Sequence, residues 1–217
     1  MRRHYLRWQT SATLLVMTGS LIAGSLGCVT QGTHNEVQEE RDRLLVRAQS
    51  LRVANQKMEE ELAALRLRSI AIEEELKDEV VAGKIRIDEI QNGIRVDVSN
   101  QLLFNSGSAI LSEQGRDVIL RLAKQLREGD ETISVEGHTD NVMIGAALES
   151  QYPSNWELAG ARAARVVRRL SAEGVDPLRL RAVSRGPFYP QASNDTAEGR
   201  SRNRRTEILL RPAAAGL

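Results

Sequence analysis

The sequence predicts an α/β fold, in which a two-layer α+β sandwich is preceded by a long coiled-coil helix and an N-terminal signal or anchor segment. Three observations support this prediction. An apolar stretch follows a basic start, a seven-residue apolar repeat comes next, and alternating strand and helix patterns fill the rest. The 217 residues therefore divide into a leader over 1–28, a linker over 29–34, a coiled coil over 35–81, a domain over 84–212 and a tail over 213–217.

Composition narrows the classes of protein to which the chain can belong. Charged residues make up 27% and hydrophobic residues 41%, so the chain is not disordered throughout. One cysteine excludes an intrachain disulfide, and three histidines leave little for a Cys/His zinc site. The net charge of +1 combines a leader of +3, a helical segment of −4 over 36–80 and a remainder of +2. This balance gives no global attraction to nucleic acid.

The leader has the pattern of a secretory signal, because the uncharged apolar stretch Ala12–Val29 follows three arginines. Its end resembles a bacterial lipoprotein signal, although Ser25 stands where such signals usually carry Leu three places before the cysteine. The resemblance implies that Cys28 is lipidated and becomes the mature N-terminus. The alternative is an uncleaved membrane anchor, since residues 12–30 approach the ~20 residues needed to cross a bilayer. Either way, we expect the remainder to lie outside the cytoplasmic membrane.

A heptad repeat follows the linker, and neither Gly nor Pro interrupts residues 35–81. The residues that recur every seven positions are Val37, Leu44, Leu51, Met58, Leu65 and Ile72. Strict sevens predict a left-handed coiled coil and hence a homo-oligomer, with the polar Asn55 at an a position setting register and strand number. The alternative is a long amphipathic helix folded back on the C-terminal domain.

The apolar period changes to two after Lys84. Alternating apolar residues on either side of Asn92-Gly93 predict a β-hairpin with strands over 85–90 and 94–98. Residues 101–105 predict a short strand end, which a Ser-Gly-Ser turn follows.

Two helices and three further strands complete the predicted domain. Residues 111–126 have the pattern of one helix, and a capping box of Ser154 and Glu157 opens a second helix that Gly174 ends. Strands are expected over 132–136, 178–184 and 206–210, with loops over 141–153 and 186–203. Strands that alternate with two helices imply a sheet covered on one face.

The common catalytic motifs are missing from the sequence, so we expect no enzyme, metal or cofactor. His138 and Asp140 lie one residue apart at a strand end, but the domain has no other histidine to complete an acid–base or metal site. We expect His138 to support its loop by a hydrogen bond. The basic run over 200–205 has no aromatic neighbour for base stacking, which favours a solvated or carboxylate-binding face over nucleic-acid binding.

Four stretches of the domain carry a family resemblance. They are Leu103–Ala109, Val135–Asp140, Tyr152–Leu158 with Ala161–Ala163, and Ser193–Arg200 with Asn203–Arg205. In this order and spacing they resemble the OmpA/MotB C-terminal domain, over about residues 94–211. The resemblance implies an OmpA-like sandwich that binds peptidoglycan non-covalently and without catalysis, through the diaminopimelate of its stem peptide.

Carried over residue by residue, the resemblance also implies a site. Asp140 and Arg162 match the pair that grips diaminopimelate, and the chemistry agrees, since a guanidinium fork suits a carboxylate and a carboxylate suits an ammonium group. Asn155 and Arg204 match further ligand contacts. Each residue alone has another interpretation: a helix start for Asn155, a surface charge for Arg162, a strand-edge charge for Arg204 and a turn cap for Asp140.

Phe104 and Asn105 match the pocket wall at a strand end. Many relatives carry Asp at the position of Asn105, so this chain has one negative charge fewer there. The resemblance therefore gives Asn105 no definite role in charge recognition.

The Tyr152–Leu158 and Ser193–Thr196 stretches resemble flagellar stator proteins more closely than porins. A stator needs an ion-carrying acid in its membrane helix, and Ala12–Val29 has none, while no series of alternating strands precedes the domain as a porin would require. We therefore expect a lipid-anchored protein on the periplasmic side of the outer membrane, tethering that membrane to peptidoglycan through its stalk. The absence of Asp directly after Cys28 favours this membrane. The alternative is a stator-type protein anchored in the inner membrane.

Overall fold

The computed structural model describes residues 12–213, and it describes side chains except those of residues 12–31 and 146–147. Residues 1–11 of the predicted leader and the side chain of Cys28 lie outside this description. The chain divides into two compact units, one up to Lys57 and one from Met58 onward. Among the described residues, no helix has both the length and the apolar character that crossing a membrane requires.

One helix, α1 (Ala12–Glu75), carries the whole heptad repeat. Its heptad residues differ between the two units. In the first unit Val37, Leu44 and Leu51 are 57–67% exposed, whereas in the second unit Leu65 and Ile72 are buried in the domain core.

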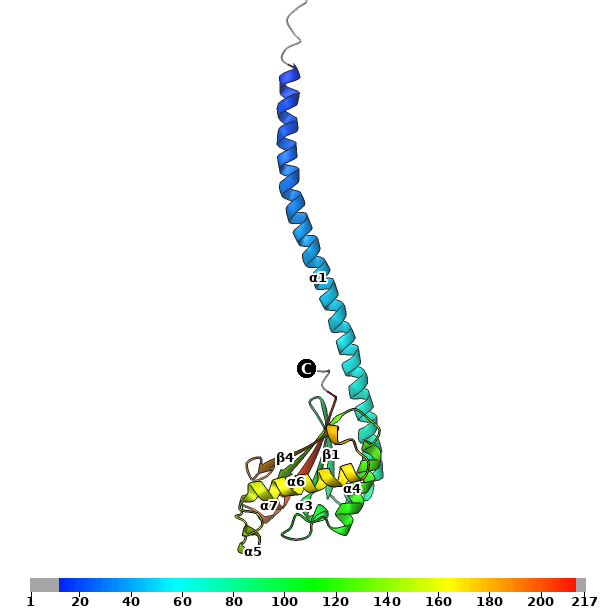
Figure 1. The fold of residues 1–217 in the computed structure, drawn as a ribbon, viewed down its shortest axis with the longest axis vertical. Coiled ribbons are helices and arrows are strands. Elements are labelled where there is room, and N and C mark those ends of the chain that lie inside the picture. Colours follow the sequence, from blue (N-terminus) through cyan, green and yellow to red (C-terminus); the bar gives the residue numbers. More distant parts are fainter. Residues whose placement is uncertain (1–11, 214–217) are drawn as a thin grey trace, which may run out of the picture. The chain divides into compact units, whose positions relative to one another are not determined.

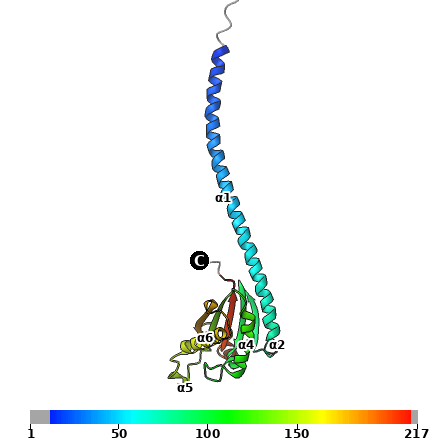
Figure 2. The same cartoon turned by 45° about the vertical axis from the view of Figure 1, so that its right-hand side comes forward.

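The last part of α1 therefore belongs to the domain rather than to a free stalk. A short helix, α2 (Lys77–Val81), follows it, and Arg121 donates hydrogen bonds to the Glu75 carbonyl and the Glu79 carboxylate. Figure 2 shows α2 and the end of α1 beside the domain. The predicted coiled coil over 35–81 is corrected here: Leu65 and Ile72, the last two residues of the heptad series, are buried within the same chain.

A five-stranded mixed sheet forms the domain, in the order β1-β2-β5-β3-β4 (Figure 1). The strands are β1 (Ile85–Ile90), β2 (Gly93–Ser99), β3 (Thr132–His138), β4 (Leu180–Gly186) and β5 (Arg205–Arg211). Only β3 and β4 run parallel among these pairs. The predicted hairpin is confirmed, with β1 and β2 paired antiparallel around Asn92, whose φ of 58° is that of a tight hairpin turn.

Two long helices, α4 (Glu113–Leu126) and α6 (Asn155–Ala172), cover one face of the sheet (Figure 1). Ser112 and Ser154 cap them by accepting the backbone N–H groups of Gly115 and Trp156. Ser154 and Glu157 are in contact, as the predicted capping box implies, but the Ser154 hydroxyl accepts the N–H of Trp156 rather than that of Glu157. The approach of α6 to β3 depends on Gly137, because a Cβ there would lie 2.1 Å from the Ala159 carbonyl oxygen. The two-layer arrangement is as predicted.

The remaining helices are short and were not predicted. They are α3 (Asn100–Leu103), α5 (Ala146–Glu149), a 3-10 turn (Pro177–Arg179) and α7 (Ala197–Asn203). The strand end expected over 101–105 is present only at Phe104, which forms an isolated β-bridge with Leu111, and α3 precedes it. The Asn100 side chain bonds to Thr206 and to the His138 carbonyl and fixes the start of this helical turn. The loop expected over 186–203 contains α7, which Thr196 caps.

The second face of the sheet carries charged residues in place of apolar ones. Glu136 of β3 lies directly opposite Glu207 of β5, and Arg185 and Arg205 compensate these two carboxylates. Gln191 covers part of this face by donating to Asp97 and Glu207. The sheet is therefore covered by helices on one face and stabilised by ion pairs on the other.

Candidate functional site

The predicted site residues come from separate elements that meet at one end of the sheet. Asp140 follows the end of β3, Arg204 directly precedes β5, and Phe104 follows α3. Asn155 begins α6, and Arg162 lies two turns further along that helix. Because β5 is antiparallel to both β2 and β3, its first residues lie beside the ends of those strands. The fold thus gathers residues that are up to 100 positions apart.

Asp140 and Arg204 form a direct ion pair. The Arg204 Nη1 atom lies 2.6 Å from the Asp140 Oδ2 atom, and the Asp140 Oδ1 atom accepts the Val142 N–H at 3.2 Å. The Asp140 side chain is 10% exposed and that of Arg204 34% exposed. Asp140 therefore caps its own turn, as one interpretation anticipated, and also holds Arg204 at the rim.

Arg162 is buried without an ion-pair partner. Its Nε atom donates to the Ser108 carbonyl at 3.0 Å, and its guanidinium carbon lies 5.3 Å from the centre of the Phe104 ring. Within the described part of the chain, its Nη atoms have no hydrogen-bond partner and no carboxylate forms an ion pair with it. It is therefore not the surface charge that one interpretation allowed.

The surroundings of Arg162 make its charge costly. Burial lowers the pKa of the Arg162 guanidinium to about 10; Tyr152 and Asp140 oppose this shift, whereas the positive charge of Arg204 adds to it. A pKa of about 10 still leaves the guanidinium charged at neutral pH. Burial of a charge without a direct partner costs free energy, and such residues are typical of binding sites.

Asn155 supports the loop that carries Asp140. Its Nδ2 atom donates to the Val142 carbonyl at 2.8 Å and reaches the Asp140 carbonyl at 3.5 Å. Ser154, rather than Asn155, caps the helix. The amide of Asn155 is thus committed to positioning the Asp140 turn.

Phe104 and Asn105 occupy different environments although they are adjacent. Phe104 is 3% exposed and forms the floor beneath Arg162, whereas Asn105 is exposed. Among the described residues, the hydrogen bonds of Asn105 come from its backbone, which donates to the Ile110 carbonyl at 3.0 Å and accepts from the Ser108 N–H at 3.1 Å. Asn105 therefore shapes the turn that presents the Ser108 carbonyl to Arg162.

His138 does not play the role expected from the sequence. Its ring nitrogens have no hydrogen-bond partner among the described residues, and its backbone carbonyl, rather than its ring, accepts the Asn100 side chain. Burial lowers the pKa of His138 to about 4, so the ring is neutral at pH 7. Sequence patterns could not reveal this, because the contacts of a ring depend on the packing around it.

A cluster of Glu136, His138 and Glu207 has metal-ligating atoms within 4.8 Å of one another. Arg185 already forms two hydrogen bonds to Glu136, at 2.6 and 3.1 Å, and Arg205 pairs with Glu207 at 2.6 Å. A divalent cation would add charge to carboxylates that are already neutralised. The donor set therefore fits an ion-pair network better than a metal centre.

The site can recognise a zwitterion. Arg162 offers a guanidinium with two free nitrogens to a carboxylate, and the Asp140–Arg204 pair offers a carboxylate to an ammonium group. Sequence reasoning missed two members of this site. The Ser108 carbonyl carries no side-chain signal, and Tyr152 lay in a recognised motif without being singled out for its influence on Arg162.

Comparison with known proteins gives matches over the same region. Residues 103–204 match the model of the OmpA family. The chain is 33% identical over 141 residues to the Probable lipoprotein YiaD of Escherichia coli K12, covering 64% of this chain and 61% of that protein. It is 31% identical over 150 residues to Motility protein B of Bacillus subtilis 168, covering 66% of this chain and 55% of that protein. The chain thus spans little more than half the length of these relatives.

A solved structure gives a further match. The cell wall anchor of the T6SS from Pseudomonas aeruginosa superimposes with a TM-score of 0.59 at 35% sequence identity. The match covers 64% of this chain and 95% of that chain. Nearly the whole of that chain therefore has a counterpart in this one.

Proposed function

The chain belongs to the OmpA family, and on that premise we propose that its C-terminal domain binds peptidoglycan without catalysing a reaction. The proposed ligand group is the diaminopimelate of the stem peptide. Its second amino-acid centre is a zwitterion, which matches the Arg162 and Asp140–Arg204 array in charge. The name of the solved cell wall anchor supports attachment to the cell wall.

In this proposal each residue has a chemical task. Arg162 binds the carboxylate through its two free nitrogens, and Asp140 accepts the ammonium group while Arg204 stays on its other side. Asn155 holds the Asp140 turn, Phe104 supports the guanidinium from below, and the Asn105 turn presents Ser108.

One observation carries the proposal: Arg162 is 7% exposed and charged, yet it pairs with no carboxylate of the described chain. A folded protein retains such a group against its desolvation cost when an external anion completes the pair. A purely structural arginine would have a carboxylate partner, as Arg205 does.

Sedimentation of the full-length protein with purified peptidoglycan sacculi tests this proposal. We expect the wild-type chain to co-sediment and Arg162→Ala to remain in the supernatant. The matched control is Arg168→Ala, which removes an exposed arginine from the same helix and should bind as the wild type does. Undiminished binding by Arg162→Ala would refute the site assignment. Soluble muropeptides released by the wild-type protein would refute the absence of catalysis.

The anchor is a separate part of the proposal. We propose that Cys28 is lipidated and fixes the chain to the periplasmic side of the outer membrane, so that the protein joins membrane to wall. The similarity to the Probable lipoprotein YiaD supports a lipid anchor. Incorporation of labelled palmitate that is lost in Cys28→Ser would agree with it.

The second candidate is a stator-type protein with an inner-membrane helix, which the likeness to Motility protein B favours. A wild-type chain that incorporates no labelled palmitate and fractionates with the inner membrane would favour this candidate and contradict the lipid anchor.

We also propose that the chain self-associates through α1, and only through the part of α1 that lies in the first unit, up to Lys57. Val37, Leu44 and Leu51 remain exposed at heptad spacing, whereas Leu65 and Ile72 pack into the domain. Sedimentation equilibrium should give a homo-oligomer for the wild-type chain and a monomer for a Leu44→Asp, Leu51→Asp variant. A monomeric wild-type chain would contradict this part.

A further inference from the structure

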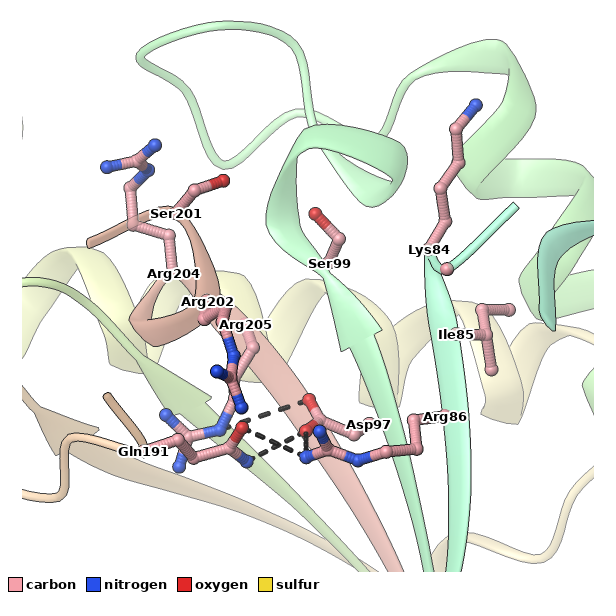
Figure 3. A pocket seen from close by; sticks show the side chains of 11 residues that line it. Lys84, Ile85, Arg86, Asp97, Ser99, Gln191, Ser201, Arg202, Arg204 and Arg205 are labelled. Atoms are coloured by element: carbon pink, nitrogen blue, oxygen red, sulfur yellow. Dashed lines mark hydrogen bonds and ion pairs between the residues drawn. The ribbon is translucent and has the colours of Figure 1, made fainter. Parts of the chain in front are cut away.

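A pocket of about 260 Å³ lies beside the proposed diaminopimelate site, between the start of β1, the end of β2 and the residues around α7. We call it the basic pocket. Its lining residues are Lys84, Arg86, Asp97, Gln191, Arg202 and Arg204, together with Gly83, Ile85, Ser99, Ser201 and Arg205. Figure 3 shows Lys84 and Arg204 on opposite sides of it, with the Ser99 and Ser201 hydroxyls between them.

The charges that line the basic pocket do not balance. Five of its side chains are cationic and Asp97 alone is anionic. Asp97 is already engaged, since Arg86 lies 2.7 Å from its Oδ2 atom and Gln191 donates to the same atom at 2.7 Å. Figure 3 shows these contacts grouped at one end of the pocket. The pocket therefore has an excess of positive charge that its own carboxylate cannot neutralise.

Two cations account for this excess. Arg86, Arg204 and Arg205 each pair with a carboxylate. Lys84 and Arg202, by contrast, are exposed, and neither side chain has a hydrogen-bond or ion-pair partner among the described residues. Together with the Ser99 and Ser201 hydroxyls they can surround an anion with donors on several sides.

Arg204 connects the basic pocket to the diaminopimelate site. It lines the pocket, and its Nη1 atom contacts Asp140 at 2.6 Å. A peptide bound at Arg162 and Asp140 thus lies next to the pocket, and stem peptides carry free carboxylates besides those of diaminopimelate. A carboxylate suits the pocket because Lys84 supplies a point charge, Arg202 a planar guanidinium fork and the two serines hydroxyl donors.

We propose that the basic pocket is a second subsite, which binds another carboxylate of the same stem peptide through Lys84 and Arg202. This inference rests on the proposed function, since the peptide must first be held at Arg162. It divides recognition into two parts: the diaminopimelate site selects the zwitterion, and the basic pocket adds affinity for the acidic peptide that carries it.

Calorimetric titration of the full-length protein tests the inference with two probes, free meso-diaminopimelate and the tetrapeptide L-Ala-γ-D-Glu-meso-diaminopimelate-D-Ala. The variant is Lys84→Gln with Arg202→Gln. We expect it to bind the tetrapeptide about fivefold more weakly than the wild type, the size expected for two exposed charge contacts. Its affinity for free diaminopimelate should stay within about twofold of the wild type.

The matched control removes two other exposed cations, in Lys124→Gln with Arg181→Gln. It makes the same change in net charge away from the basic pocket and should bind both probes as the wild type does. Because the contacts are ionic, raising the salt concentration should reduce the difference between wild type and variant.

The outcomes separate this inference from the proposed function. Tetrapeptide binding that requires Arg162 but is unchanged in the Lys84, Arg202 variant overturns the second subsite alone. An equal loss in the control variant also overturns it, because net charge would then explain the effect. A wild-type chain that binds neither probe overturns the proposed function and the subsite with it.

Discussion

Buried charges are paired on the open face of the sheet, but the buried charge of Arg162 at the end of the sheet is not. On the open face of the sheet, arginines neutralise the buried carboxylates, as Arg205 does for Glu207 and the partly exposed Arg185 does for Glu136. At the end of the sheet, Arg162 is equally buried but has no carboxylate partner among the described residues. Desolvation of charge costs free energy in both regions, but ion pairs within the protein offset that cost on the open face and not for Arg162.

This difference separates charges that hold the fold from charges that await a ligand. A paired buried charge is expected to affect stability when its partner is removed. An unpaired one is expected to affect binding and to contribute little to stability.

Glu207→Ala should reduce the free energy of unfolding by about 3–4 kcal/mol, because it leaves the buried Arg205 guanidinium without its closest carboxylate. Chemical denaturation of the full-length protein measures this change. Glu128→Ala, at an exposed position, is the control and should change stability by less than about 0.5 kcal/mol. A similar small change in Glu207→Ala would remove the distinction between the two regions.

The buried His138 ring on the open face should make the free energy of unfolding depend on pH. Its pKa falls from 6.5 to about 4, chiefly through burial; Arg205 and Arg185 act in the same direction, and Glu207 and Glu136 oppose them. Between these two values the unfolded chain binds a proton that the folded chain does not, so stability decreases as pH falls from about 7 to about 4. The loss should be about 2–3 kcal/mol.

Denaturation at several pH values checks this prediction by comparing wild type with His138→Gln. Glu207 also loses stabilisation on acidification, because its folded pKa is lowered despite burial, chiefly by Arg205. The histidine's share is therefore the difference between the two curves. Parallel curves from pH 7 to pH 4 would contradict it.

Arg162→Leu should change the free energy of unfolding by less than about 1 kcal/mol, the smallest effect in this series. It loses the bond to the Ser108 carbonyl but also removes a buried charge without a carboxylate partner. Binding of sacculi should be lost in the same variant. Destabilisation comparable to that of Glu207→Ala would show that Arg162 holds the fold.

Local signals predicted the parts of the fold that depend on neighbouring residues. The Asn92 turn and the Ser154 cap are such cases, since their geometry depends on a few adjacent positions. Helix α3 could not be predicted in this way, because Asn100 bonds to Thr206, 106 positions away. Helix α7 has no apolar period, and the fully buried Asn203 side chain organises the loop before it through bonds to Ala192 and Asn194.

The heptad repeat and the candidate site show the same limit of prediction from sequence. Repeated sevens predicted the helix but could not tell which repeats face another chain, because Leu65 and Leu44 have the same pattern and opposite exposure. Family motifs predicted which residues gather at the end of β3. They could not predict that Asp140 pairs with Arg204 rather than with Arg162, because this choice depends on side-chain geometry.

The role of Arg162 in ligand recognition can be measured with two matched stem tetrapeptides, one containing meso-diaminopimelate and the other L-lysine at the same position. Lysine lacks the carboxylate that the unpaired Arg162 is proposed to bind, and all other groups are the same. We expect calorimetry with the full-length protein to give at least a tenfold weaker affinity for the lysine peptide, about 1.4 kcal/mol. Equal affinities for the two peptides would contradict the account.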